Sequence, residues 1–232
     1  MSILVECKQL SKCYGKRRIF QNFDLQLESG RIIGLLGPNG SGKTTLIKIL
    51  AGLLKKNGGE VSIDGRMVGI ETKKIVSYLP ERTYIAPSMR VREAMDFFED
   101  FYEDFERNTA SEMLAKLDIS EDSRIKELSK GTREKVQLVL VMSRKAHLYL
   151  LDEPMGGVDP AARDFILRTI LTNYNPESSI IISTHLISDV EKVLDDVVFI
   201  RQGQLILHRT VDEIREQHGK SVDALFREVF AC

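Results

Sequence analysis

A glycine-rich loop constrains the fold of this chain more than any other segment. Residues 37–44, GPNGSGKT, match the pattern GxxxxGK[ST] in full, between an apolar run at Ile32–Leu36 and a helical pattern at Thr44–Leu53. In this strand–loop–helix context the glycines let backbone N–H groups point at phosphate oxygens, helped by the positive end of the helix. We expect Lys43 to be accessible in the empty protein and to reach the β- and γ-phosphates of a nucleotide, while the Thr44 hydroxyl binds Mg²⁺. A purely structural turn is the alternative, and the flanking strand and helix disfavour it.

Short apolar runs alternate with longer helical patterns along the chain, which is typical of an α/β domain. Turn signals such as Ser29-Gly30 and Asp64-Gly65 separate several of the runs. We predict strands at Ile32–Leu36, Val61–Ile63, Ile75–Leu79, Leu148–Leu151, Ile180–Ser183, Val197–Ile200 and Leu205–His208. Two short helices are expected in the tail after Thr210.

The alternation of strands and helices breaks between Pro87 and Leu128. Apolar residues recur at three- and four-residue steps from Val91 to Phe105, which predicts one helix, and a second helical pattern covers Asn108–Leu117. We interpret this region as a helical subdomain inserted in the α/β core. Its aromatic stripe is expected to be its own packing core, with a docking surface for a partner as the alternative. The outer face of the first helix is predicted to be acidic, which argues against nucleic-acid binding there; its residues are Glu93, Asp96, Glu99, Asp100, Glu103 and Asp104.

The composition argues against several classes of protein. Lys plus Arg (33) and Asp plus Glu (34) nearly cancel over the 232 residues, so no whole-chain basic field would recruit nucleic acid or anionic lipid. No apolar stretch approaches the roughly 20 residues needed to span a bilayer. The three cysteines, Cys7, Cys13 and Cys232, are scattered and do not suit a disulfide framework or a zinc ribbon. We therefore expect a soluble, intracellular protein.

Two carboxylates follow an apolar run far along the chain from Lys43. The run at Leu148–Leu151 ends in Asp152-Glu153-Pro154. Ligands of parallel α/β sheets bind at the carboxyl ends of strands, so these side chains suit the same site as the phosphate loop. Asp152 would hold Mg²⁺ through water, and Glu153 would orient and polarise the attacking water as the general base.

The segment Leu128-Ser129-Lys130-Gly131-Thr132 lies between the two motifs and precedes an amphipathic helix. By itself, Ser129 predicts only a helix cap. The order of phosphate loop, helical insert, this segment and Asp-Glu strand, however, resembles the ATP-binding subunit of an ABC transporter. The signature of that family is usually Leu-Ser-Gly-Gly-Gln. Ser129 and Gly131 match it, whereas Lys130 and Thr132 depart from it.

The resemblance implies an α/β fold with a P-loop NTPase core and a mostly parallel sheet, an N-terminal antiparallel β subdomain and an inserted helical subdomain. We expect a single ABC ATPase domain over residues 1–232. The core would comprise 1–86 and 146–208, the helical subdomain 87–145 and a C-terminal helical tail 209–232. The implied ligands are ATP and Mg²⁺. The expected ATP-binding residues are Tyr14, Gly37, Pro38, Asn39, Gly40, Ser41, Gly42, Lys43, Thr44 and Thr45.

Smaller elements of the family can also be matched to this sequence. Tyr14 resembles the aromatic residue that stacks on adenine, with a core tyrosine on an N-terminal strand as the alternative. Asp159 resembles the carboxylate of the loop that crosses the dimer interface, and His185 resembles the switch histidine that touches the γ-phosphate. These resemblances add His185 to Glu153 as a catalytic residue.

Glu81 is a departure from the family, because it falls where a glutamine typically links the nucleotide to the membrane partner. It keeps an oxygen acceptor, loses the amide donor and adds a negative charge near Mg²⁺. The resemblance assigns Glu81 a catalytic role and, with Thr44 and Asp152, a place among the metal-binding residues.

The resemblance further implies that two subunits meet head to tail and sandwich two ATP molecules. Each ATP would lie on the phosphate loop of one chain and under Ser129, Lys130, Gly131 and Thr132 of the other, so that binding closes the dimer and hydrolysis reopens it. The partner would be a second copy or a different ATPase subunit. A separate membrane-spanning permease would carry the substrate, which would place this chain on the cytoplasmic face of the cell membrane. The Tyr-Leu-Pro-Glu and Leu-Ser-Lys-Gly variants resemble those of drug, antibiotic and ABC-2-type exporters.

Two other kinds of function compete with transport. ABC ATPases of translation usually carry two cassettes in one chain, and those of DNA repair split the cassette with a long coiled coil, for which the interval from Lys43 to Asp152 is too short. An ATPase that serves a soluble assembly stays open.

Overall fold

The computed structural model describes residues 2–156, 160–172 and 177–231. Its strands are β1 (Ile3–Tyr14), β2 (Arg17–Glu28), β3 (Ile32–Leu36), β4 (Gly58–Ile63), β5 (Arg66–Met67), β6 (Val76–Leu79), β7 (Leu148–Asp152), β8 (Ser179–Thr184), β9 (Asp196–Arg201) and β10 (Gln204–Thr210). Its helices are α1 (Lys43–Leu50), α2 (Ile70–Ile75), α3 (Val91–Phe101), α4 (Arg107–Lys116), α5 (Lys130–Met142), α6 (Pro160–Thr172), α7 (Ile187–Val190), α8 (Val211–His218) and α9 (Val222–Phe230), with short 3-10 turns η1 (Ile125–Glu127) and η2 (Glu191–Val193).

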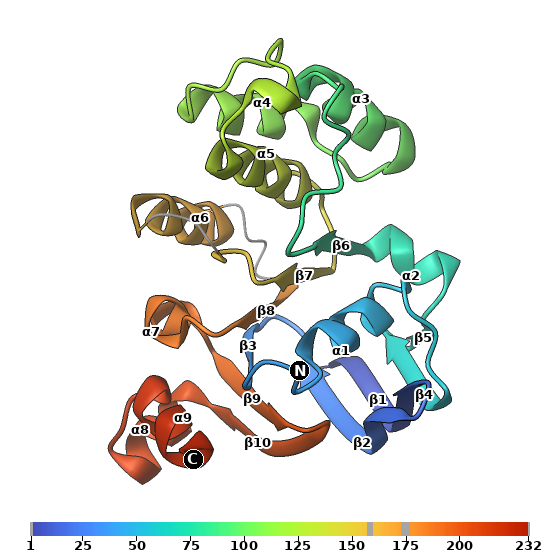
Figure 1. The fold of residues 1–232 in the computed structure, drawn as a ribbon, viewed down its shortest axis with the longest axis vertical. Coiled ribbons are helices and arrows are strands. Elements are labelled where there is room, and N and C mark those ends of the chain that lie inside the picture. The colour runs from blue at the N-terminus through green and yellow to red at the C-terminus, as the bar shows by residue number, and fades with distance from the viewer. Residues whose placement is uncertain (1, 157–159, 173–176, 232) are drawn as a thin grey trace.

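The central sheet contains six of these strands in the order β10-β9-β3-β8-β7-β6 (Figure 1). The pairs β9·β3, β3·β8, β8·β7 and β7·β6 are parallel, and β10 returns antiparallel along β9. The predicted mostly parallel sheet is therefore confirmed. Because parallel strands end at one edge, the segments that follow β3, β7 and β8 meet there.

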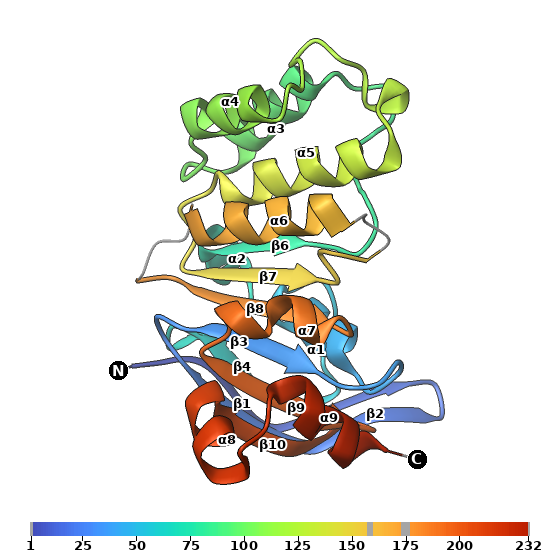
Figure 2. The ribbon, with the colours of Figure 1, turned by 90° about the vertical axis from the view of Figure 1, so that its left-hand side faces the viewer.

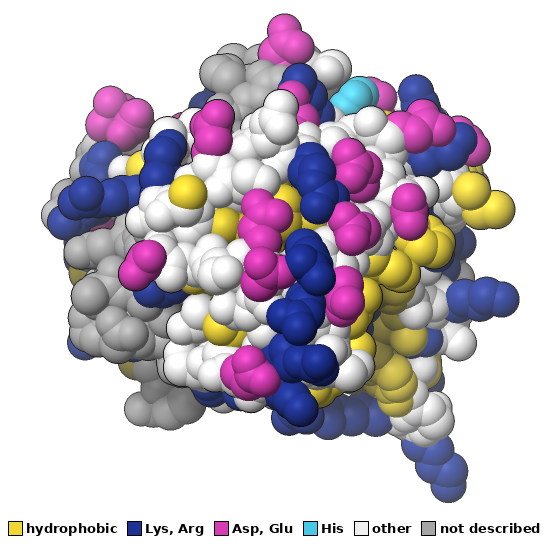
Figure 3. All heavy atoms as spheres, turned by 90° about the horizontal axis from the view of Figure 1, so that it is seen from above, with side chains coloured by type: hydrophobic (Ala, Val, Ile, Leu, Met, Phe, Trp, Pro, Cys, Tyr) yellow, Lys and Arg dark blue, Asp and Glu magenta, His cyan; other side chains and the backbone are white. Residues whose placement is uncertain are grey.

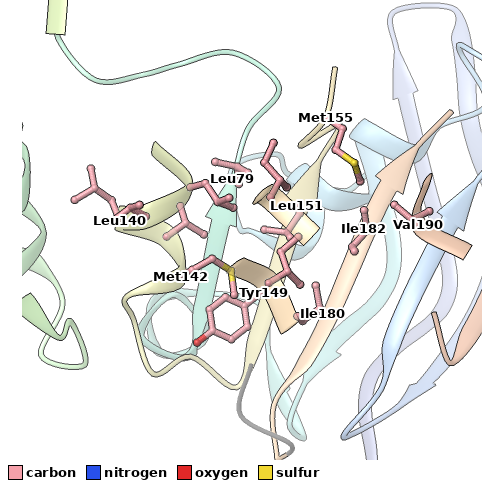
Figure 4. Close-up of a cluster of buried hydrophobic side chains, with 14 of the residues drawn as sticks. Leu79, Leu140, Met142, Tyr149, Leu151, Met155, Ile180, Ile182 and Val190 are labelled. Atoms are coloured by element: carbon pink, nitrogen blue, oxygen red, sulfur yellow. The ribbon is translucent and has the colours of Figure 1, made fainter. Parts of the chain in front are cut away.

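Both faces of the inner strands β3, β7, β8 and β9 are buried, which explains why these strands are largely apolar runs in the sequence, whereas the edge strand β10 is mostly exposed. In β3, Ile33 and Leu35 belong to the cluster that includes α1 and the antiparallel strands, while Ile32 and Leu36 belong to the cluster on the other face. Figure 4 shows part of that second cluster, where side chains of β7 and β8 meet Met142 of α5 and Val190 of α7. The alternation follows from the period of two in a strand.

A second sheet, in the order β2-β1-β4-β5, is antiparallel and lies beside α1 (Figure 1). Its apolar side, which includes Phe20, Phe23 and Leu25, packs in the same cluster as Leu46 and Leu50 of α1. This is the N-terminal antiparallel β subdomain that the resemblance implies.

Helices α3, α4 and α5 gather at one end of the molecule, beyond β6 (Figures 1 and 2). The prediction of one helix from Val91 to Phe105 is wrong at its end. The helix stops at Phe101, because Tyr102 has an extended backbone (φ −128°, ψ 105°). The aromatic stripe contains both buried and exposed side chains. Phe98 and Phe105 are buried, whereas Phe97 and Phe101 are 45% and 68% exposed, so only part of the stripe is a packing core.

The acidic face predicted for α3 is partly neutralised by basic side chains. Arg107 pairs with Asp96 at 2.6 Å and with Glu99 at 3.0 Å, and Arg144 pairs with Asp104 at 2.9 Å. Viewed from the helical end, acidic and basic side chains alternate over the surface (Figure 3). The acidic residues of this face are therefore interspersed with basic partners that come from other elements.

The two helices expected after Thr210 are present as α8 and α9. Thr210 accepts a hydrogen bond from Glu213 N–H and Ser221 accepts one from Ala224 N–H, so each helix begins at a hydroxyl cap. None of the described helices is long and apolar enough to cross a lipid bilayer.

Candidate nucleotide site

The phosphate loop joins β3 to α1 and requires glycine at defined points. Gly42 has φ 115°, and a Cβ there would lie 2.8 Å from the ring of Phe20. At Gly37 a Cβ would lie 2.2 Å from the carbonyl oxygen of Ile200. The loop is thus held between β2 on one side and β9 on the other. The helix that follows is α1, which is shorter than the predicted Thr44–Leu53 and ends at Leu50.

Lys43 is buried, which contradicts the expectation that its side chain would be accessible. Its side chain is only 6% exposed, and its ammonium donates hydrogen bonds to the carbonyl oxygens of Gly37 (2.7 Å) and Pro38 (3.3 Å). An ammonium has three donors, and two of these are used by the carbonyl oxygens of its own loop. Burial lowers the pKa of Lys43, and the nearby carboxylates of Glu153 and Asp152 oppose this shift.

Asp152 lies at the end of β7, where its carboxylate meets two hydroxyl groups. Oδ1 accepts hydrogen bonds from Thr44 (3.1 Å) and from Ser183 (2.6 Å). Oδ2 is buried and has no hydrogen-bond partner among the described residues. Sequence analysis placed Ser183 at the end of a predicted strand but assigned it no role in the site. Its position at the strand end was the signal that could have revealed this contact with Asp152.

The oxygen atoms of Thr44 and Asp152 fit a magnesium ion. Mg²⁺ prefers oxygen ligands and usually combines one or two protein groups with phosphates and water. The buried, unpartnered Oδ2 of Asp152 is the kind of atom that such a cation would satisfy. No group of three or more His, Cys, Asp or Glu that could hold a metal occurs among the described residues. Phosphate oxygens of the nucleotide and water would supply further ligands.

Glu153 and His185 follow the neighbouring strands β7 and β8. The Nδ1 atom of His185 lies 2.9 Å from Oε2 of Glu153. Glu153 has the left-handed φ of 50°, which is uncommon for a residue other than glycine. Its N–H donates to the carbonyl oxygen of Ser183 at 3.0 Å and to the Ser183 hydroxyl at 3.2 Å. These hydrogen bonds hold the strained backbone that aims the carboxylate at His185.

A cavity of about 620 Å³ collects most of the predicted site residues. Those that line it are Tyr14, Asn39, Gly40, Gly42, Lys43, Thr44, Thr45, Glu81, Glu153 and His185. Tyr14 is half-exposed there, so the alternative of a core tyrosine is wrong. Sequence reasoning missed Arg17, Ile19 and Gly156, which also line the cavity. Arg17 and Ile19 alternate along β2, directly after the turn from Tyr14, and this spacing could have revealed them.

The signature segment lies elsewhere in the chain, at the start of α5. Ser129 is the N-cap and accepts a hydrogen bond from Thr132 N–H at 3.1 Å. Neither Ser129, Gly131 nor Thr132 lines the 620 Å³ cavity, and Lys130 lines an adjoining cavity of about 580 Å³ with Glu81 and His185. Asp159 lies outside the described residues.

Residues 20–156 match the profile of the family described as "ABC transporter". The chain belongs to the ABC transporter family. It is 30% identical over 220 residues to the "SkfA peptide export ATP-binding protein SkfE" of Bacillus subtilis, covering 92% of each protein. It is 27% identical to the "Linearmycin resistance ATP-binding protein LnrL" of the same species, covering 93% of this chain and 72% of that protein. A solved "Structure of ATP binding subunit of ABC transporter" superposes with a TM-score of 0.86 at 28% identity, covering 97% of this chain and 99% of that one.

These similarities confirm the predicted fold and the resemblance on which it rested. As a member of the ABC transporter family, the chain is an ATP-binding subunit of a family that hydrolyses ATP to power transport. Its relatives include subunits named for peptide export and antibiotic resistance.

Proposed function

We propose that this ABC ATPase subunit dimerises around ATP and Mg²⁺ and powers export through a separate membrane-spanning permease. The observation that carries the proposal is an incomplete site. Lys43, Thr44, Glu153 and His185 line one cavity, whereas no residue of the signature segment at Ser129 lines it. A second chain that presents its own signature segment would complete the site.

Within one chain, each residue would have a distinct role toward ATP. Tyr14 would stack on adenine, and the N–H groups of the loop would bind the phosphates. Lys43 would exchange the carbonyl oxygens of Gly37 and Pro38 for the β- and γ-phosphates. Thr44 and Asp152 would hold Mg²⁺, which supplies charge neutralisation to the phosphates when bound. The other ATP-binding residues would act mainly through their backbone.

Glu153 would orient the attacking water and accept its proton. His185, 2.9 Å from the Glu153 carboxylate, would fix that carboxylate and contact the γ-phosphate. Glu81 is exposed at the border of both cavities, where it would face the phosphate end of the nucleotide and act with the Mg²⁺ ligands.

The start of α5 is suited to bind a phosphate of the nucleotide that the partner chain holds. The helix has 13 residues, and a Cβ at Gly131 would have no atom within 4 Å, so the backbone is open to an approaching group. Lys130 adds a positive charge beside the helix N-terminus. Asp159 would contribute to the same interface.

A groove of about 530 Å³ offers a surface for the permease. It runs between the sheet core and α3 and is lined by aromatic residues that include Tyr78, Tyr84 and the exposed Phe97. Lys48 and Arg82 also line the groove. A permease segment with apolar anchors and acidic side chains would complement it, and this favours partner docking for the exposed part of the aromatic stripe. The relative SkfE, which is named for peptide export, supports that direction of transport.

The proposal retains the division into a core (1–86 and 146–208), a helical subdomain (87–145) and a tail (209–232). It places the chain on the cytoplasmic face of the cell membrane. The partner in the ATP-bound dimer would be a second copy or a different ATPase subunit.

Dimerisation can be tested with Glu153→Gln, which should bind ATP but hydrolyse it roughly 10²–10⁴-fold more slowly. Size-exclusion chromatography with ATP, with ADP and without nucleotide should show a dimer with ATP alone, because the polar interface needs the γ-phosphates. A dimer that forms regardless of nucleotide would contradict the proposal. If the variant stays monomeric with bound ATP, adding the ATPase subunit encoded next to it should restore the dimer.

The proposed association with a permease can be tested by co-purification. A tagged chain expressed with the permease encoded next to it should elute with that permease from solubilised membranes. Recovery from the cytosol alone, with a soluble partner, would favour the alternative of a soluble assembly.

A further inference from the structure

We propose that Arg17 binds the α-phosphate of the nucleotide and is a second cation of the phosphate site beside Lys43. This inference rests on the proposed position of adenine on Tyr14. It concerns a residue to which neither the phosphate loop nor the signature segment assigns a role.

The hairpin of β1 and β2 brings Arg17 next to Tyr14. The two residues are direct cross-strand partners at the end of the hairpin, where Gly15 makes the turn with φ 56°. Side chains of directly opposed residues lie on the same face of an antiparallel pair, about 5 Å apart at Cβ. Both side chains line the 620 Å³ cavity, together with Ile19 on the same strand.

Arg17 also lies against the tip of the phosphate loop. Its Nη2 atom is 3.5 Å from the position that a Cβ on Gly40 would occupy. The guanidinium therefore lies beside Gly40 and belongs to the residue that is paired with Tyr14. Tyr14 marks the adenine end of the proposed site, and Thr44 with Asp152 marks the opposite end, where the γ-phosphate would bind. The phosphate nearest to adenine is the α-phosphate.

The charge of Arg17 is available for a ligand. Among the described residues it forms no ion pair with an acidic side chain, whereas Arg107 of α4 pairs with Asp96 and Glu99. The carboxylates that line the cavity are those of Glu81 and Glu153. A guanidinium can donate two parallel hydrogen bonds to a phosphate, which a lysine ammonium cannot do with the same geometry.

A contact with the α-phosphate would be shared by ATP, ADP and AMP. This contact would strengthen binding of the substrate and of the transition state equally. Loss of the contact should therefore raise KM and leave kcat unchanged. A residue that acted on the γ-phosphate would instead distinguish ATP from ADP.

Arg18 provides a matched control, because it is the adjacent arginine of β2 and carries the same charge. It does not line the cavity, and its guanidinium donates a hydrogen bond to the side chain of Gln21 at 3.2 Å. Arg18→Ala removes one charge from the same strand without touching the proposed contact.

The test compares Arg17→Ala, Arg17→Lys and Arg18→Ala in the full chain. Dissociation constants for ATP and ADP come from calorimetry, and that for AMP from displacement of a fluorescent ADP analogue. Arg17→Ala should weaken binding of all three nucleotides by the same factor, about tenfold, as expected for a charge-assisted hydrogen bond. Arg17→Lys should recover part of the loss, and the loss should shrink with added salt because the site is exposed.

Three results would overturn the proposal: equal behaviour of Arg17→Ala and Arg18→Ala, a loss with ATP alone, or a loss with ATP and ADP but not with AMP. The measurement uses the isolated chain and its nucleotides. Failure of the proposed dimer or permease partnership would leave its outcome unchanged, so the two proposals fail separately.

Discussion

The hydroxyl of Thr44 donates a hydrogen bond of 3.1 Å to Oδ1 of Asp152, across 108 positions of sequence. Thr44 stands in the first turn of α1, and Asp152 ends β7, so the contact joins the phosphate loop to the strand that carries Glu153. The second oxygen of Asp152 is left buried and without a partner among the described residues. The two proposed metal-binding groups are therefore already adjacent in the protein.

Lys43→Ala should abolish ATP binding and hydrolysis, because it removes the cation that the phosphates require. Since Lys43 is buried and bonded to two loop carbonyls, the variant should also lose stability, by about 1 kcal/mol. Circular dichroism should report a retained fold with a melting temperature lowered by a few degrees. Lys48→Ala, which changes an exposed lysine of the same helix, is the control. Near-normal ATPase activity of Lys43→Ala would contradict the assignment of the phosphate loop.

Tyr14→Ala should weaken ATP binding by on the order of 1 kcal/mol, and Tyr14→Phe should have almost no effect, because stacking needs the ring and not the hydroxyl. In the structure the ammonium of Lys12 lies 5.2 Å from the centroid of the Tyr14 ring. Calorimetric titration of both variants measures the difference. If the Ala and Phe variants bound ATP equally well, Tyr14 would not stack on adenine.

The inner strands β3, β7, β8 and β9 of the central sheet could be predicted from sequence because burial on both faces makes each of them a compact apolar run. The proposed site residues that belong to local motifs, such as Lys43 and Glu153, could be selected from the sequence for a similar reason: each motif is contiguous. The resemblance to ABC transporter subunits then supplied Tyr14, Glu81 and His185, which no local pattern marks, and the structure places all three around the cavity.

The errors came from contacts between segments far apart in the sequence. Lys43 is buried and donates hydrogen bonds to two carbonyl oxygens of its own loop, and the sequence motif does not indicate these contacts. Phe105 continues the periodicity of α3 but lies beyond Tyr102, where the backbone is already extended. Arg17 was missed because its proposed role depends on the cross-strand pair with Tyr14 and on the approach to Gly40.

In the absence of Mg²⁺, Glu81→Gln should tighten ATP binding by about twofold, because it removes an exposed negative charge from the cavity that would receive the phosphates. The effect should fade as salt is added. Stimulation of the ATPase by the permease should also change, because the amide adds a donor at the proposed coupling position. Titrations and ATPase assays with and without the permease test this, with Glu81→Ala alongside. If stimulation stayed the same in both variants, Glu81 would not couple the two subunits.

Asp196 provides a test of stability away from the nucleotide site. It begins β9, is only 6% exposed, and its Oδ1 has no hydrogen-bond partner among the described residues. Burial raises the pKa of this carboxyl group, and the positive charges of Arg31 and His208 oppose the shift. The neighbouring Asp195 differs, because its Oδ2 accepts a hydrogen bond from Ile32 N–H at 2.8 Å.

Asp196→Asn should stabilise the protein at neutral pH. A carboxyl group whose pKa is raised on folding binds more protons in the folded chain than in the unfolded one, between its ordinary pKa and its raised pKa. The wild type therefore loses stability as the pH rises through that window, and the loss is complete above it. The amide never ionises, so the variant should be more stable by on the order of 1 kcal/mol at pH 7.5, and the difference should vanish at about pH 4, near the ordinary aspartate pKa.

Urea unfolding at the two pH values measures this, and Asp195→Asn, which changes a carboxylate with a partner, should bring no gain. An advantage of Asp196→Asn that was the same at both pH values would show that the carboxylate charge is not its cause.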